Sequence, residues 1–207
     1  MLPEQIKTIK KFQTSSIKEK GSEFLAIVYS IDNEESASNL LKEVRKKYYD
    51  ATHHCYAYKL KNGDLKYSDD GEPNGTAGVR ILSAIDHFNL SDVLLIIVRY
   101  FGGTKLGVGP LGKAYYNASI NVLSHSEMIT KTLYQLVLIE TEFKFISHIH
   151  RTISNYSGII SDSEFSDKAK FECFIKANDF EKLNIELSNL TDGQVLIQRK
   201  SDYKYFS

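Results

Sequence analysis

The sequence is poor in several residue types and has no long apolar run. Among its 207 residues are no tryptophan, two cysteines and three prolines. Cys55 and Cys173 lie far apart and form no disulfide framework, which favours a reducing cytosol. No run reaches the roughly 18 apolar residues of a membrane span, and the first residues lack the charged and apolar regions of a secretory signal. We therefore expect a cytoplasmic protein without a membrane partner.

An excess of charge of one sign is also missing. The 26 Lys and Arg residues balance the 26 Asp and Glu residues, so the formal net charge is zero. A surface that binds polyanions diffusely is therefore not indicated, although a local basic patch is compatible with this balance. The hydrophobic content of 42% is enough for the cores of one large domain or two small ones.

Apolar periodicity predicts alternating strands and helices in the first part of the chain. Asp32, with Glu35 three residues later, is expected to cap the first helix, and Asn62-Gly63 predicts a hairpin. Residues 93–98 are apolar throughout, which is typical of a fully buried central strand. The expected elements are a lead-in strand or hairpin arm within 1–21, a strand at 22–31, a helix after residue 32, strands at 50–60 and 64–67, a helix that begins at Asn74 or Thr76 and ends at Asn89, a strand at 92–100, and a helix from Pro110 through Val122.

The pattern restarts after a short polar segment at residues 124–127, where we expect a domain boundary. Asn178, with Glu181 three residues later, is expected to cap the last helix. The expected elements are a strand at 131–140, a helix at 143–156, strands at 158–163 and 168–176, a helix after residue 178 and a strand at 194–199. This βαββαβ order is that of ferredoxin-like domains, so the sequence predicts an α+β protein with domains at 1–127 and 128–207.

Glycine is concentrated in one stretch. Eight of the 12 glycines lie between Gly71 and Gly112. Glycine inside an element costs about 0.5–1 kcal/mol relative to alanine, so it recurs where the backbone takes a positive φ or approaches another group closely. Acidic and basic residues alternate with these glycines. We therefore expect residues 68–113 to contain the functional site.

Three carboxylates, Asp69, Asp70 and Glu72, lie within four residues of this stretch. They could bind a hard cation through oxygen ligands, although the spacing of a calcium loop is absent. Alternatively, the aspartates bond backbone amides of their own turn and cap the next helix. Because acidic turns are common, the sequence favours a structural turn over a metal site here, and Asp69, Asp70 and Glu72 remain candidate ligands of the latter.

A second motif, Gly75-Thr76-Ala77-Gly78, is expected to start a helix. Free amides and the helix dipole at such a terminus attract anions, whereas close packing of the helix on the sheet would also require the glycines. The segment has neither the Gly-Lys-Ser/Thr ending of a phosphate loop nor the dinucleotide fingerprint.

The third motif follows the buried strand and brings cations to a glycine-rich loop. Arg99, Lys105 and Lys113 lie beside a predicted helix N-terminus, an arrangement that suits phosphate of a nucleotide or of an RNA backbone. Tyr100 and Phe101 could stack on a base. Alternatively, the glycines shape a long loop and the lysines are merely solvated.

A fourth motif, His53-His54-Cys55, falls at a predicted strand start. His53 and Cys55 share one face of that strand, which leaves them short of a zinc site, and no CxxC is present. A cysteine nucleophile beside a histidine is conceivable, although packing roles are more usual for such residues. His53 and Cys55 are therefore the only candidate catalytic residues.

The chain contains three ordered motifs, namely Asp50-Ala51-Thr52-His53-His54-Cys55-Tyr56-Ala57, Ser68-Asp69-Asp70-Gly71-Glu72-Pro73-Asn74-Gly75-Thr76-Ala77-Gly78 and Val98-Arg99-Tyr100-Phe101-Gly102-Gly103-Thr104-Lys105-Leu106-Gly107. Together they resemble the signature of the IMPACT family, in its bacterial YigZ-like branch. The chain departs from the family pattern in two places. Val79-Arg80 stands where the family usually has a residue followed by proline, and Gly109-Pro110-Leu111 stands where a second Gly-Gly-Leu is usual.

The resemblance implies a fold and a cellular process. It implies an N-terminal domain like domain four of elongation factor G and a small-subunit ribosomal protein, and a C-terminal domain like the last domain of elongation factor G. The eukaryotic relatives regulate translation initiation by interfering with the activation of an amino-acid-starvation kinase. Bacteria lack that kinase circuit, so only contact with RNA, the ribosome or a translation-associated protein carries over.

We therefore expect a non-enzymatic binding protein without a cofactor. A small enzyme or a nucleotide-binding protein, and a wholly structural role of the motif, are the alternatives. The candidate binding residues are Asp69, Asp70, Glu72, Gly75, Thr76, Arg99, Tyr100, Gly102, Gly103, Lys105, Gly107 and Lys113.

Overall fold

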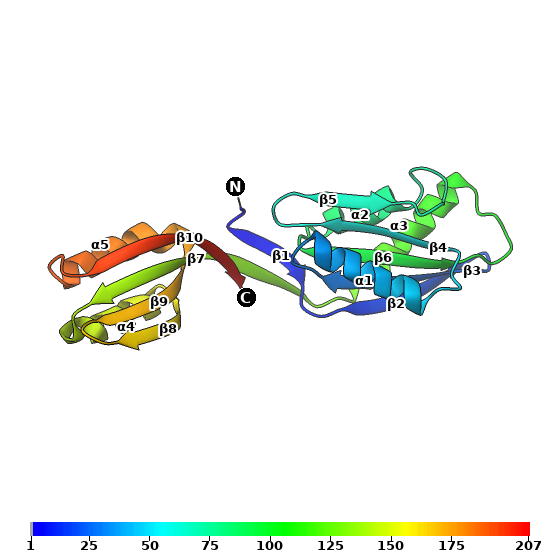
Figure 1. The fold of residues 1–207 in the computed structure, drawn as a ribbon. Helices are drawn as coiled ribbons and strands as arrows, with labels where there is room; N and C mark the ends of the chain where they lie inside the picture. Colours follow the sequence, from blue (N-terminus) through cyan, green and yellow to red (C-terminus); the bar gives the residue numbers. More distant parts are fainter. Residues whose placement is uncertain (1) are drawn as a thin grey trace. The chain divides into compact units, whose positions relative to one another are not determined.

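The computed structural model describes residues 2–207, which form an α+β protein of two compact units. The first unit ends at Thr130 and the second begins at Lys131 (Figure 1). Each unit has its own buried core. No helix in residues 2–207 is both long enough and apolar enough to cross a membrane.

The N-terminal unit is built on an antiparallel sheet of five strands. Their order across the sheet is β2-β3-β6-β4-β5, and the lead-in strand β1 (Gln5–Ile9) precedes them in the chain. The expected hairpin at Asn62-Gly63 is confirmed, because β4 and β5 pair on either side of it. The strands are β2 (Gln13–Glu19), β3 (Ser22–Ser30), β4 (His53–Lys59), β5 (Leu65–Ser68) and β6 (Val93–Tyr100).

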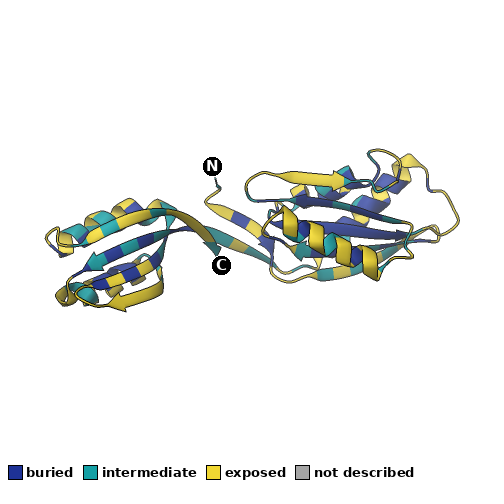
Figure 2. Ribbon diagram, in the orientation of Figure 1, coloured by how far each residue is buried: buried dark blue, intermediate teal, exposed yellow. Residues whose placement is uncertain are grey.

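Helices cover both faces of this sheet. Helix α1 (Glu34–Lys47) packs on one face, and α2 (Gly78–His87) and α3 (Val108–Ser124) pack on the other. The central strand β6 is therefore buried on both sides, as its apolar run predicted (Figure 2). Its residues Leu94 and Ile96 contact the α1 side, and neighbouring residues contact α2 and α3.

The C-terminal unit has the element order βαββαβ that the sequence predicts. Its strands pair antiparallel in the order β10-β7-β9-β8, and both helices share one core with the sheet. The last strand is longer than the expected 194–199, because it resumes pairing with β7 after a register shift between Arg199 and Tyr203. The elements are β7 (Met128–Thr141), α4 (Ile146–Asn155), β8 (Ile159–Phe165), β9 (Ala169–Lys176), α5 (Phe180–Leu190) and β10 (Leu196–Phe206), with short 3-10 turns at Phe143–Phe145 and Ala177–Asp179.

The expected cap at Asp32 is wrong by one residue. The N-cap of α1 is Asn33, whose side-chain oxygen accepts from the Ser36 amide at 2.8 Å. The Ser36 hydroxyl in turn accepts from the Asn33 amide at 3.3 Å, so Ser36 rather than Glu35 completes the capping box.

The two other predicted helix starts are also displaced. Helix α5 has Asp179 at its N-cap and no side-chain cap, because a 3-10 turn at Ala177–Asp179 precedes it, so Asn178 does not cap it. Helix α2 begins at Gly78 rather than at residue 74 or 76, and its N-cap Ala77 has no side-chain oxygen that could accept from the first amides. An acceptor from outside the helix satisfies its first amides.

Candidate functional site

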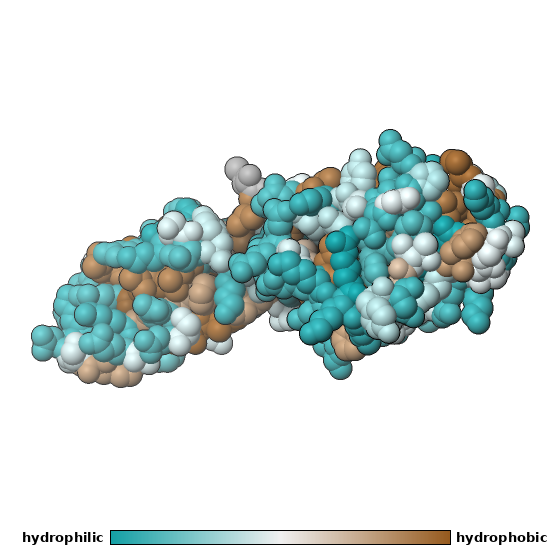
Figure 3. Space-filling view, turned by 45° about the vertical axis from the view of Figure 1, so that its right-hand side comes forward, coloured by the Kyte–Doolittle hydropathy of each residue, from teal (hydrophilic) through white to brown (hydrophobic). Residues whose placement is uncertain are grey.

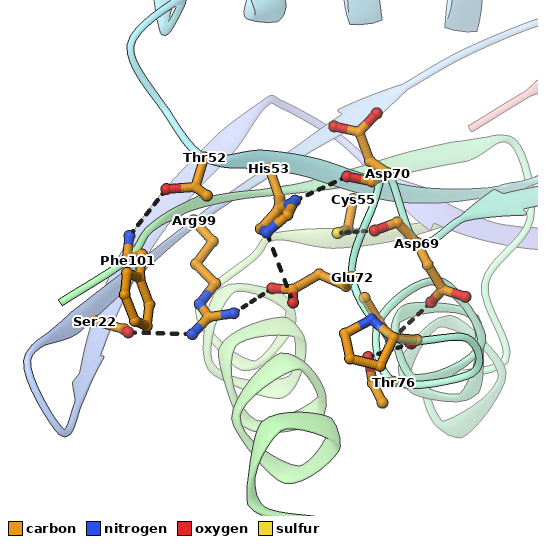
Figure 4. A network of polar contacts seen from close by, with 12 residues as sticks. Ser22, Thr52, His53, Cys55, Asp69, Asp70, Glu72, Thr76, Arg99 and Phe101 are labelled. Carbon is orange, nitrogen blue, oxygen red and sulfur yellow. Dashed lines mark hydrogen bonds and ion pairs between the residues drawn. The ribbon is translucent and has the colours of Figure 1, made fainter. Parts of the chain in front are cut away.

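The candidate site lies where the ends of β3, β4 and β6 meet in the sheet of the N-terminal unit. The register places Arg99 of β6 opposite Phe24 on β3 and opposite His53 on β4. The acidic turn after β5 brings Glu72 to the same place (Figure 4). Three segments that are distant in the sequence therefore share one set of polar contacts.

Arg99 and Glu72 form a buried ion pair. Arg99 is 5% exposed and Glu72 is 8% exposed, and Nη1 of Arg99 donates to Oε1 of Glu72. The Tyr115 hydroxyl donates to the same oxygen at 2.7 Å, and Nε2 of His53 lies 3.7 Å from Oε2. Because its charge is neutralised inside the protein, Arg99 does not present a cation to phosphate, and its expected binding role is replaced by a structural one.

The Arg99 guanidinium is enclosed on its other sides as well. Its carbon Cζ lies 5.3 Å from the centroid of the Phe24 ring and 5.6 Å from that of Phe101. Nη2 donates to the Ser22 hydroxyl at 3.3 Å, whereas Nε has no hydrogen-bond partner within residues 2–207. The side chain is thus held in one position by aromatic faces and by two oxygens.

The Asp69 carboxylate caps α2 from outside the helix. One oxygen accepts from the amides of Ala77 at 2.9 Å and Gly78 at 2.8 Å, and the other accepts from Gly75 at 2.8 Å. The Thr76 hydroxyl donates to the carbonyl of Pro73 at 2.6 Å. The amides that the sequence suggested for an external anion are therefore already taken, and the capping alternative holds for this turn.

The same contacts predict how stability depends on pH. Burial alone would raise the pKa of Asp69, but the backbone N–H donors of Gly75, Gly78 and Ala77 outweigh it and lower the pKa. The stabilisation is thus present above the unfolded-state pKa of about 3.9 and is lost as pH falls through the lower folded-state value. Asp69→Asn is expected to reduce the free energy of unfolding at neutral pH by about 1–3 kcal/mol, because the negative charge is lost and only one of the two side-chain ends, the carbonyl oxygen, can still accept, which leaves at least one backbone N–H facing an NH₂ group.

Urea unfolding of both proteins at pH 7 and pH 3 measures this effect. The difference between wild type and Asp69→Asn is expected to shrink at pH 3, because the unfolded chain binds a proton at Asp69 below its pKa of about 3.9 while the lowered pKa of the folded protein disfavours it. Asp167→Asn, at an exposed turn, is the control, and its free energy of unfolding is expected to match that of wild type at both pH values. A difference for Asp69→Asn that stays constant with pH would refute the ionised cap.

Asp70 has partners of its own. Its carboxylate accepts from Nη2 of Arg45 at 2.6 Å and from the His54 amide at 2.7 Å, and its carbonyl oxygen lies 2.8 Å from Nδ1 of His53. The three carboxylates of the acidic turn therefore point to separate partners. The described residues contain no group of three His, Cys, Asp or Glu side chains that could hold a metal ion, so the metal alternative has no geometric support.

Cys55 is unsuited to nucleophilic catalysis. The residue is fully buried, and Sγ donates to the carbonyl oxygen of Asp69 at 3.0 Å and lies 3.3 Å from the Tyr115 hydroxyl. Burial raises the pKa of its thiol far above the ordinary value, so the thiolate is not formed at neutral pH. His53 is half-buried between Asp70 and Glu72 and helps to fix the turn.

The loop over residues 101–107 is fixed at its base and exposed beyond it. The Phe101 amide donates to the Thr52 hydroxyl at 3.1 Å, and the Gly102 amide donates to the Ser22 hydroxyl at 3.1 Å. Gly102 lies against the backbone of Gly21, where a Cβ atom would come within 1.9 Å of the carbonyl carbon. Beyond this point Gly103 and Gly107 both have a φ of 84°, and Lys105 between them is exposed. Ser22 and Thr52 were not expected from the sequence, since single hydroxyls carry no local signal.

Tyr100 lies on the opposite face of β6 from Arg99. Its hydroxyl donates to Oδ1 of Asp50 at 3.1 Å, on the side of the sheet that α1 covers. Tyr100 and Phe101 therefore do not form one stacking surface. Phe101, at 46% exposure, is the accessible ring of the two.

A shallow groove runs between α2 and α3. Arg80 is exposed on α2 and Lys113 on α3, and no carboxylate lines this groove in the part of the chain that the structure describes. A Cβ atom at Gly112 would lie 3.3 Å from Nε of Arg80, so the glycine leaves space for that side chain. Arg80 was not among the expected residues, because a single arginine within a helix looks like an ordinary solvated side chain. The lining residues are Arg80, Ser83, Gly109, Gly112, Lys113 and Tyr116.

Comparisons of sequence and of structure each found proteins similar to this chain. Residues 20–123 match the Impact N-terminal domain, and residues 140–194 match a domain of unknown function. IMPACT family member YvyE of Bacillus subtilis (strain 168) is 28% identical over 199 residues, which cover 95% of this chain and 89% of that protein. An IMPACT family member of Thermus thermophilus, encoded in the pol 5′ region, is 36% identical over 130 residues, 62% of this chain and 70% of that protein. The crystal structure of a hypothetical protein superimposes with a TM-score of 0.71 and 25% identity, covering 97% of this chain and all of the other.

Proposed function

Because this chain belongs to the IMPACT family, whose members include YigZ-like bacterial proteins, we propose that it is a non-enzymatic regulator linked to translation that binds RNA. Family membership supports the connection with translation. The binding surface is the basic groove, defined here as Arg80, Lys113 and the loop 101–107 with Lys105. A ribosome-associated protein is the other partner that the family connection suggests.

The two units support this assignment through their architecture. We propose that residues 1–127 form a domain like domain four of elongation factor G, with a sheet covered by helices on both faces. Residues 128–207 would form a ferredoxin-like domain, since the strand order β10-β7-β9-β8 accompanies the βαββαβ chain order. Both likenesses connect the chain with translation by analogy of fold alone.

The proposal depends on a difference between the N-termini of α2 and α3: the first amides of α2 are capped by a side chain, and those of α3 are not. The first amides of α2 are capped by Asp69 from within the protein. Helix α3 has Gly107 at its N-cap and no side-chain cap, so its dipole and first amides favour an external anion. Lys113 lies within that helix and Arg80 across the groove, which adds two exposed cations without an acidic neighbour in the groove.

Charge reversal in the basic groove tests the proposal. Arg80→Glu and Lys113→Glu are each expected to weaken binding of a single-stranded RNA about equally for different sequences, because phosphate contacts carry no base information. Each is also expected to lower the slope of log K against log salt by about one. Fluorescence anisotropy of labelled RNA over a salt series measures both quantities.

The matched control is Lys46→Glu on α1, which lies on the other side of the sheet. It makes the same change of charge and is expected to leave RNA affinity nearly unchanged. An equal loss of RNA affinity in all three variants would mean that the net charge, rather than the groove, determines binding. Unchanged RNA affinity in both groove variants would refute the proposal. Competition by a mononucleotide at micromolar concentration would instead support the nucleotide-binding alternative.

A further inference from the structure

The sheet of the C-terminal unit has helices on one face only. Helices α4 and α5 pack on the face that carries Val137, Ile139 and Phe171. No helix of residues 131–207 covers the other face, which we call the open sheet face. The surface of this unit shows apolar side chains among hydrophilic ones (Figure 3).

The strand register assigns the side chains of the open sheet face to rows. In one row Glu140 of β7 lies opposite Lys170 of β9, which lies opposite Glu164 of β8. In the next row Leu138 lies opposite Glu172. Leu196 of β10 pairs with Glu140, and half of its surface is exposed. A groove of about 270 Å³ on this face is lined by Leu138, Ile139, Glu140, Asp162, Ser163, Glu164, Lys170, Phe171, Glu172, Leu196 and Gln198.

Acidic and apolar side chains line the groove together. Four carboxylates and one lysine line it, which leaves a charge of −3 (−4 + 1). Lys168 reaches Glu140 at 2.8 Å from the side and offsets one of these charges. The groove therefore keeps an excess of negative charge next to Leu138 and Leu196, which are incompletely buried.

Two of these carboxylates face each other without a cation between them. Asp162 lies directly opposite Glu172, and like charges in that position destabilise a pair of strands. Within residues 2–207 neither forms an ion pair, and Asp162 accepts only from the amide of its neighbour Ser163, at 2.8 Å. Such a pair becomes favourable when a cationic group from outside lies between the two.

We propose that the open sheet face docks a basic, amphipathic segment of a partner protein. Lysine or arginine side chains of the segment pair with Asp162 and Glu172, while its apolar side chains cover Leu138 and Leu196. An RNA backbone would meet the carboxylates with charge of the same sign, so this face is not a second RNA surface. The inference is independent of the basic groove, because it concerns the other unit.

The test uses Asp162→Lys in the full chain. The substitution places a lysine opposite Glu172, so it removes the repulsion and is expected to keep or raise the melting temperature. The same variant is expected to weaken binding of a fluorescent 14-residue peptide of lysine and leucine, patterned as an amphipathic helix, by at least fivefold in anisotropy titrations at 0.15 M salt. Loss of fold cannot explain a weaker affinity in a variant that is no less stable.

Two further variants complete the design. Leu196→Ser removes an exposed apolar contact and is expected to weaken the peptide affinity about threefold. Asp167→Lys makes the same change of charge in the exposed turn after β8, outside the groove, and is expected to bind the peptide as tightly as wild type does. The proposal is overturned if wild type does not bind the peptide at 100 µM, or if Asp162→Lys binds the peptide as tightly as wild type does. It is equally overturned if Asp167→Lys weakens the peptide affinity as much as Asp162→Lys does. It is also overturned if single-stranded RNA binds wild type and this binding is lost in Leu196→Ser.

Discussion

Replacing Glu72 with glutamine is expected to destabilise the N-terminal unit by about 3–5 kcal/mol. The substitution keeps the shape of the side chain but removes the charge that neutralises Arg99, which is 5% exposed. A guanidinium that is enclosed by Phe24 and Phe101 cannot turn to water, so its desolvation is left uncompensated. The expected loss is therefore that of an unpaired buried charge rather than of one hydrogen bond.

Urea denaturation followed by circular dichroism measures this loss. Glu34→Gln is the matched control, because it breaks the exposed pair with Lys66 at 3.2 Å and is expected to leave the unfolding midpoint unchanged. The double variant Glu72→Gln/Arg99→Met removes both charges and is expected to recover much of the stability. If Glu72→Gln behaves like Glu34→Gln, the pair does not hold the site together.

Ser22 connects the buried pair of Arg99 and Glu72 to the base of the exposed loop 101–107. Ser22 accepts from both Arg99 and the Gly102 amide, so the side chain that fixes the guanidinium also fixes the base of the loop. The buried Arg99 and Glu72 therefore support the surface, whereas the exposed cations near it are Lys105, Lys113 and Arg80. This division of roles explains why so many polar residues of the motif are buried.

The sequence predicted the buried strand and the close backbone contacts better than the roles of the charged residues beside them. The run at residues 93–98 predicted a buried central strand because continuous apolar residues have no solvated face. Glycine density predicted residues 68–113 because tight backbone contacts exclude side chains, as Gly102 and Gly78 show. Arg99 was expected to meet phosphate, but local sequence does not reveal that its side chain is buried against Glu72. For Asp69 the sequence offered both a cation and the cap of the next helix, and the contacts support the cap.

Contacts between segments that are distant in the sequence explain the other differences between the predicted and the observed roles of residues. Helix α2 starts without its own capping residue because Asp69, several residues upstream, accepts from its amides. Cys55 contacts the carbonyl of Asp69 only because β4 runs beside the acidic turn. Arg80 is notable only because α3 places Gly112 and Lys113 across from it. Each of these roles depends on which elements become neighbours, which periodicity does not encode.

Gly102→Ala is expected to reduce the free energy of unfolding by about 3 kcal/mol, at the upper end of what overpacking causes. A Cβ atom at this position would lie 1.9 Å from the carbonyl carbon of Gly21 and 2.3 Å from the Ser22 nitrogen. These atoms are backbone, so no side chain can rotate away, and the β2–β3 turn must separate from the end of β6. That separation breaks the bond from the Gly102 amide to the Ser22 hydroxyl.

Urea unfolding and hydrogen exchange of the Phe101 and Gly102 amides measure the effect, with Gly109→Ala as the control. Gly109 has open space within 4 Å, and alanine suits the first turn of α3, so this variant is expected to be as stable as wild type or slightly more stable. Because Gly102 does not have a positive φ, a loss of stability in Gly102→Ala relative to wild type is attributable to the close approach of the backbones rather than to backbone strain. Equal stability of the two variants would mean that the loop is free to move away from Gly21, and the buried network would then not position the basic groove.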